Sequence, residues 1–75
     1  MFIEMTGKTL NDMMNEGEMG ATNLSDVGVT DESIVRINKQ GDIELRKPEG
    51  WDIVGGLIGE FEARVKHATG LNWAD

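Results

Sequence analysis

The chain has 75 residues, no cysteine and a formal net charge of −7, from 14 acidic and 7 basic residues. Its length predicts a single domain, and one histidine with no cysteine argues against disulfides and a zinc site. An acidic chain repels phosphate backbones, so we expect no direct binding to nucleic acid. A small domain without disulfides or a bound metal can gain stability by oligomerising, so a homodimer stays among the hypotheses.

The chain carries no run of about 20 apolar residues, the length that a membrane-spanning helix needs. Its first ten residues, MFIEMTGKTL, lack the basic region and the long apolar run of a signal peptide. We therefore expect a cytoplasmic protein with no membrane contact.

Residues 2–5 are predicted to form a short strand that ends at a turn. A short helix over about 9–16 follows, because its apolar residues Leu10, Met13 and Met14 share one face. Thr6 or Thr9 is a suitable N-terminal cap, and Gly17 is suited to end the helix.

The next segment, residues 17–30, is rich in Gly and turn-forming residues and reads as a loop. Residues 1–32 hold seven acids and one base, which predicts an acidic surface on this third of the chain. Its members are Asp12, Glu16, Glu18, Asp26, Asp31 and Glu32. The spacing of these acids does not fit a calcium loop, so we predict no metal site.

Residues 33–46 give the clearest local pattern, a β-hairpin. Val35 and Ile37 alternate onto one face of the first strand, and Ile43 and Leu45 do so on the second. Gly41 suits the positive-φ position of the turn. We expect the cross-strand pairs to be Ile37 with Ile43 and Val35 with Leu45.

The segment after Pro48 is predicted to be a long amphipathic helix over about 51–69, because its apolar residues recur at spacings of three and four (Val54, Leu57, Ile58, Phe61, Val65 and Ala68). Gly70 follows as a C-terminal cap. The predicted fold class is therefore α+β, in which a small antiparallel sheet, made of the N-terminal strand and the hairpin, is packed by both helices.

Three glycines of this predicted helix lie together on the face opposite the apolar stripe: Gly55, Gly56 and Gly59. Each costs about 1 kcal/mol relative to Ala inside a helix. Either they mark an irregular entry to the helix, or they form a smooth face that another backbone approaches closely. On the second interpretation the partner-binding residues are Asp52, Gly55, Gly56, Gly59, Ala63 and Lys66.

No pattern in the chain indicates catalysis. Thr6–Thr9 resembles the end of a phosphate-binding loop, but Phe2 stands where that loop requires its first Gly. His67 has no neighbouring nucleophile in the sequence, and the dipole at a helix C-terminus accounts for its position. We therefore predict no catalytic residue, no cofactor and no enzymatic activity.

Three functions remain as hypotheses. The first is a non-enzymatic protein-interaction or regulatory module that uses the acidic N-terminal third and the Gly-rich helix face. The second is an acidic inhibitor or nucleic-acid mimic that blocks a basic site on an unknown protein partner. The third is binding of a small ligand.

Overall fold

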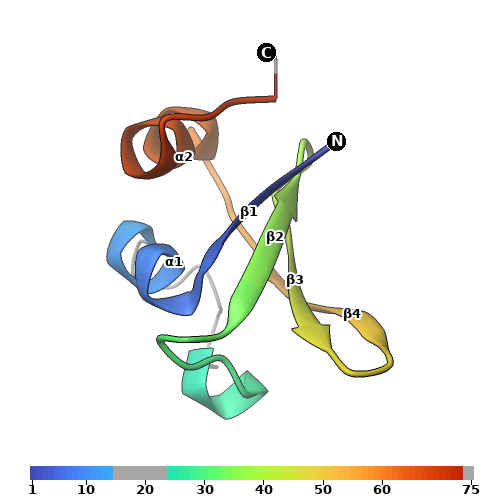
Figure 1. The fold of residues 1–75 in the computed structure, drawn as a ribbon. Coiled ribbons are helices and arrows are strands. Elements are labelled where there is room, and N and C mark those ends of the chain that lie inside the picture. Colours follow the sequence, from blue (N-terminus) through green and yellow to red (C-terminus); the bar gives the residue numbers. More distant parts are fainter. Residues whose placement is uncertain (15–23, 74–75) are drawn as a thin grey trace.

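The computed structural model describes residues 1–14 and 24–73. Its elements, in chain order, are β1 (Phe2–Thr6), α1 (Gly7–Met13), the 3₁₀-helix η1 (Leu24–Val27), β2 (Ile34–Asn38), β3 (Asp42–Lys47), β4 (Gly50–Gly56) and α2 (Phe61–Thr69) (Figure 1). The strands form one antiparallel sheet in the order β1-β2-β3-β4. The predicted α+β class is confirmed.

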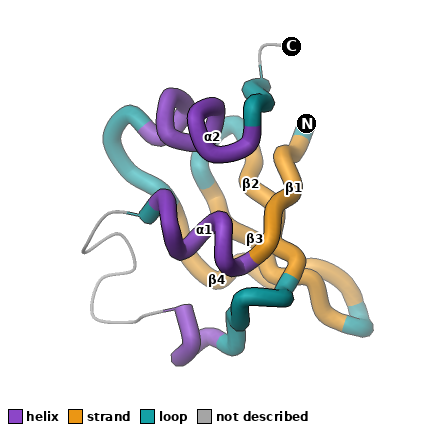
Figure 2. The backbone as a smooth tube through the Cα atoms, turned by 60° about the vertical axis from the view of Figure 1, so that its left-hand side comes forward, coloured by secondary structure: helices purple, strands orange, loops and turns teal. Residues whose placement is uncertain are grey.

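Both α-helices lie on the same face of the sheet (Figure 2). The core between the helices and the sheet is built from alternate residues of β1, β2 and β3 and from one face of α1. Its buried side chains are Ile3, Met5, Leu10, Met13, Leu24, Val29, Val35, Ile37, Ile43, Leu45, Leu57, Val65 and Trp73. Within the described residues, neither α-helix covers the opposite face of the sheet.

The central hairpin has the predicted register. Val35 pairs with Leu45 and Ile37 pairs with Ile43, and all four side chains are buried. Gly41 has a φ of 92°, which glycine adopts at little steric cost. Local alternation fixes this hairpin because a slip of one residue would turn every apolar side chain to the other face.

The predicted long helix over 51–69 is wrong in its first half. Residues 50–56 form β4, which pairs with the free edge of β3, and the helix α2 begins at Phe61. Ile43 pairs with Gly55 and Glu44 with Ile53, so Val54 is the extra residue of a β-bulge. Three glycines weaken a helix here, whereas Trp, Ile and Val favour a strand. Within residues 1–14 and 24–73 the sheet therefore has four strands instead of three.

The short helix begins and ends earlier than predicted. It spans Gly7–Met13 instead of about 9–16, and Met14 already has an extended backbone. Thr6 is the N-terminal cap, since its Oγ1 accepts a hydrogen bond from the backbone N–H of Thr9 at 3.2 Å. Gly17, predicted to end the helix, lies outside the described residues.

The C-terminal helix ends as predicted. Gly70 caps it with a φ of 76°, and its N–H donates to the carbonyl oxygen of Lys66. After the cap, the chain returns to the core through Trp73, which is buried. Among the described residues, neither helix combines the length and the apolar character that crossing a bilayer requires.

Candidate protein-interaction surface

The side of the sheet that neither α-helix covers is referred to as the open face. It consists of the strand residues that alternate with the buried ones, together with their neighbours on β4: Phe2, Glu4, Thr6, Ile34, Arg36, Asn38, Asp42, Glu44, Arg46, Trp51 and Ile53. The uncovered side of an antiparallel sheet is commonly polar. Here it also carries two aromatic and two aliphatic side chains.

Arg36 lies at the centre of the open face, layered between two aromatic rings. Its guanidinium carbon is 3.7 Å from the ring centroid of Phe2 and 4.2 Å from that of Trp51. The strand order explains this assembly, since β1 and β3 flank β2, and β4 is one strand further. Each such cation–π contact contributes about 0.5–2 kcal/mol, more when it is shielded from water.

The guanidinium of Arg36 is also paired with Glu44 on the neighbouring strand. Its Nε and Nη2 donate to the same carboxylate oxygen at 3.2 and 2.9 Å. The two side chains are 24% and 12% exposed, so the pair is largely shielded. Ion pairing and stacking together fix the guanidinium in one orientation, which makes the centre of the open face preorganised.

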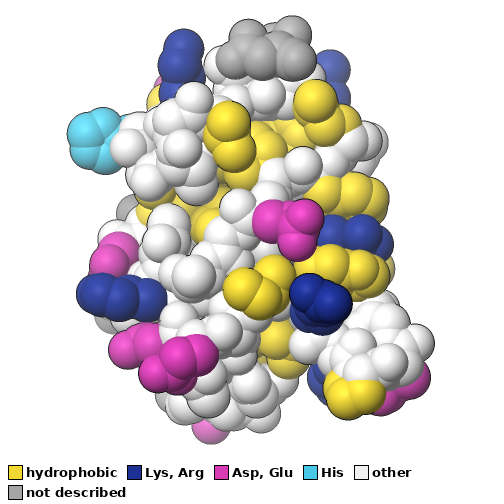
Figure 3. Space-filling view, viewed as in Figure 1, with side chains coloured by type: hydrophobic (Ala, Val, Ile, Leu, Met, Phe, Trp, Pro, Cys, Tyr) yellow, Lys and Arg dark blue, Asp and Glu magenta, His cyan; other side chains and the backbone are white. Residues whose placement is uncertain are grey.

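Apolar side chains remain accessible beside this centre. Phe2 is 41% exposed and Ile53, on the edge strand β4, is 69% exposed. The space-filling view shows hydrophobic and basic side chains lying against one another along the side where the strands run (Figure 3). Accessible apolar area next to an ordered arginine is a combination found in protein interfaces.

The six predicted partner-binding residues do not share a helix face. Asp52, Gly55 and Gly56 belong to β4, Gly59 lies in the following loop, and Ala63 and Lys66 lie on α2. The predicted Gly-rich helix face is therefore wrong. At least one of the glycines in this set has a local structural role. Gly59 has a φ of 72°, a backbone conformation that glycine adopts at little steric cost.

Asp52 has a structural partner. Its Oδ2 lies 2.7 Å from Nζ of Lys47 across the β3–β4 hairpin. The hydrogen bond to Asp52, and then the charge of that carboxylate, raise the pKa of Lys47. This pair lies near the hairpin turn, and its two charges offset each other.

Four members of the predicted acidic surface lie within the described residues, and all are exposed: Asp12, Asp26, Asp31 and Glu32. They come from α1, η1 and the segment before β2. Lys8 joins two of these parts, since its Nζ lies 3.3 Å from Asp12 and its N–H donates to the carbonyl oxygen of Asp31. Glu16 and Glu18 lie outside the described residues.

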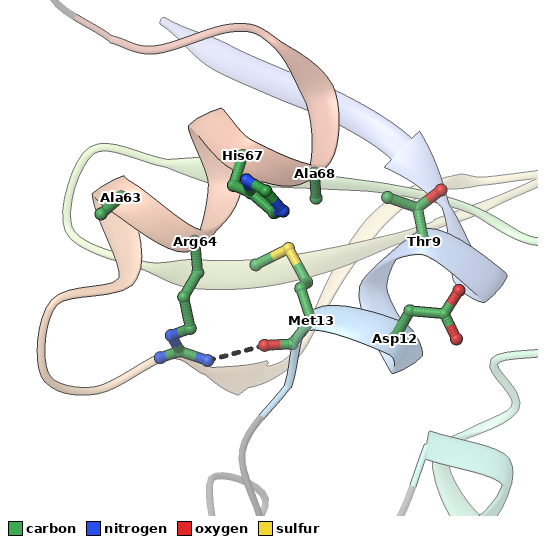
Figure 4. Close-up of a pocket in the computed structure, with 7 residues that line it drawn as sticks. All are labelled: Thr9, Asp12, Met13, Ala63, Arg64, His67 and Ala68. Carbon is green, nitrogen blue, oxygen red and sulfur yellow. Dashed lines mark hydrogen bonds between the residues drawn. The ribbon is translucent and has the colours of Figure 1, made fainter.

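A shallow groove of about 640 Å³ separates α1 from α2, with Met13 at its floor (Figure 4). Arg64 closes one end, donating to the carbonyl oxygens of Met13 and Ile58, each at 2.9 Å. His67 lines the groove as an exposed side chain. Across residues 1–14 and 24–73, no three His, Asp or Glu side chains are grouped so that they could hold a metal ion.

Sequence reasoning missed the arrangement of Phe2, Arg36 and Trp51. Alternation in the hairpin puts Arg36 on the side opposite Val35 and Ile37, but the helix predicted over 51–69 removes the ring of Trp51 from the sheet. A usable signal was the run of β-favouring residues beside a Gly pair, which is typical of an edge strand with a bulge. Comparison of the chain with protein families, with characterised proteins and with solved structures gives no match.

Proposed function

We propose that this chain is a non-enzymatic protein-interaction module and that the open face of its sheet is the contact surface. The observation that carries the proposal is the ordered layer of Phe2, Arg36 and Trp51 on a face that neither α-helix covers. Tryptophan and arginine are enriched among residues that dominate binding energy in protein interfaces. An arginine already held in place loses little side-chain entropy on binding.

The shape of this surface supports a protein partner over a small ligand. The open face is a layer of side chains on a sheet, and the groove in Figure 4 lies on the opposite, helical side. Small ligands prefer concave sites that bury most of their surface. The open face also carries Phe2, Trp51 and an ordered arginine, residue types that are enriched in protein interfaces.

Photo-crosslinking tests this proposal. A benzophenone amino acid replaces Ile53, which is 69% exposed on the open face, and in a control chain it replaces Ile58, which is 65% exposed in the loop before α2. We expect covalent protein adducts from position 53 and few from position 58, in cells that express each chain. Equal yields from both positions, or none from position 53, would refute the open face as the contact surface.

A second candidate function is inhibition of a basic site by the exposed acidic residues of α1, η1 and the segment before β2. Their carboxylates are solvent-exposed, and Lys8 is paired with one of them. Such binding rests on charge, so its affinity for a basic protein falls steeply with added salt. Binding that does not change with salt would rule out this candidate.

A further inference from the structure

We propose that the partner at the open face is a second copy of this chain, bound face to face. The inference rests on the proposed function and names the occupant of the same surface. It starts from charge. Three carboxylates and two guanidinium groups lie on the open face (Glu4, Asp42, Glu44, Arg36 and Arg46), which sum to −1 in a chain of net charge −7.

The distribution of charge therefore favours self-association through this face over the acidic part of the chain. Five of the six remaining units of net negative charge come from residues 8–32, so two copies that approach through that part repel each other more strongly. The open face carries charges of both signs, so a charged group of one copy can lie opposite a group of the other sign on the second copy. The central pair illustrates this, since Arg36 and Glu44 occupy the two central strands β2 and β3.

Symmetry places these groups opposite one another. A two-fold axis that runs along the strands between β2 and β3 brings Arg36 of one copy over Glu44 of the partner subunit, and the reverse. The same axis lays the edge strand β4 of each copy over β1 of the other. The exposed Ile53 and the partly exposed Phe2 ring are then covered, as in two aligned, packed sheets.

The size of the chain gives this association a thermodynamic reason. A domain of 75 residues with no disulfide has a small core. Covering the second face of its sheet buries four more apolar side chains, Phe2, Ile34, Trp51 and Ile53, which neither α-helix of a single copy covers.

The test is sedimentation equilibrium of the purified chain from low micromolar to millimolar concentration, at low and at high salt. We expect the mass to rise with concentration from 8.3 kDa towards twice that value. Ile53→Lys, which places a cation in the apolar contact, is expected to weaken dimerisation by about tenfold or more. Ile58→Lys makes the same change at a similarly exposed position off the face and is expected to dimerise like the parent chain.

A charge-reversal pair provides a matched second measurement. Arg46→Glu on the open face and Lys66→Glu on α2 both alter exposed residues and make the net charge more negative by the same two units. We expect Arg46→Glu to weaken dimerisation by about tenfold at low salt, and added salt to restore part of the loss. Lys66→Glu is expected to have a much smaller effect. Circular dichroism spectra that match the parent chain exclude unfolding as the cause.

The outcomes separate this inference from the proposed function. A parent chain that stays at 8.3 kDa at every concentration overturns the dimer, and so does a dimer that Ile53→Lys and Arg46→Glu leave unchanged. If that monomer still forms position-53 adducts with a different protein, the proposed function stands and the second copy is refuted. Adducts of twice the chain mass from position 53 support both.

Discussion

The indole Nε1 of Trp73 donates a 3.0 Å hydrogen bond to the carbonyl oxygen of Ile37, 36 residues earlier in the chain. The ring is buried and meets Phe61 edge to face at 5.8 Å between centroids. This contact ties the C-terminal segment to a central strand of the sheet.

Replacing Trp73 with Phe should therefore destabilise the fold. The aromatic packing is largely kept, but the buried hydrogen bond from the indole to the carbonyl oxygen of Ile37 is lost, which costs about 0.5–1.5 kcal/mol. Trp51→Phe is the matched control, since Trp51 is half-buried on the open face and its ring contact is to Arg36. Urea unfolding followed by circular dichroism measures both. A Trp73→Phe loss no larger than that of Trp51→Phe would contradict the structural role of this hydrogen bond.

Gly7 should not tolerate a side chain. A Cβ at this position would lie 1.9 Å from the carbonyl oxygen of Thr30, well inside any contact distance. We expect Gly7→Ala to lower the free energy of unfolding by about 1–3 kcal/mol, because backbone must move to make room. Gly56→Ala is the control, since its Cβ would meet its nearest neighbour at 3.8 Å. Similar thermal unfolding midpoints for the two variants would show that this close approach is not needed.

Arg36→Lys should be costly although it conserves the charge. An ammonium cannot stack as a plane between Phe2 and Trp51 while it also donates two hydrogen bonds to Glu44. We expect a loss of about 1–2 kcal/mol in the free energy of unfolding. Arg46→Lys, at an exposed position on the same face, should change stability by less than about 0.5 kcal/mol. Chemical denaturation of both variants checks this, and equal losses would contradict it.

The Lys47–Asp52 pair predicts a loss of stability at alkaline pH. Because Asp52 raises the pKa of Lys47 in the folded chain, the pair stabilises the fold below the ordinary lysine pKa of 10.5. That contribution disappears as pH rises through the raised folded value. We expect the urea midpoint to fall across this range, and to fall less in Asp52→Asn, which lacks the charged acceptor. An identical pH profile for the variant would argue against the coupling.

The central hairpin could be predicted from sequence down to its residue pairs. The apolar residues Val35, Ile37, Ile43 and Leu45 alternate along the two strands. Once one side of the sheet is buried, a one-residue slip in register would move them to the other side. The cap at Thr6 and the C-terminal Gly70 are also local, because each satisfies backbone groups within a few residues.

The segment after Pro48 shows where local pattern misleads. Val54, Leu57, Phe61 and Val65 have helical spacing, yet they belong to a strand, a connecting segment and a shorter helix. Pairing with β3 satisfies the backbone N–H and C=O groups of residues 50–56 that face it. No periodicity within the segment reveals that the edge of β3 is available for pairing.

The class of the fold, the hairpin register and the caps are therefore predictable from the amino-acid sequence, because they depend on neighbours a few positions apart. The tertiary structure decided the fourth strand and the open face. Phe2, Arg36 and Trp51 come from three separate segments, and their rings and guanidinium meet because antiparallel pairing lays β1, β2, β3 and β4 side by side. Such a site depends on strand order, a long-range property that composition and spacing do not encode.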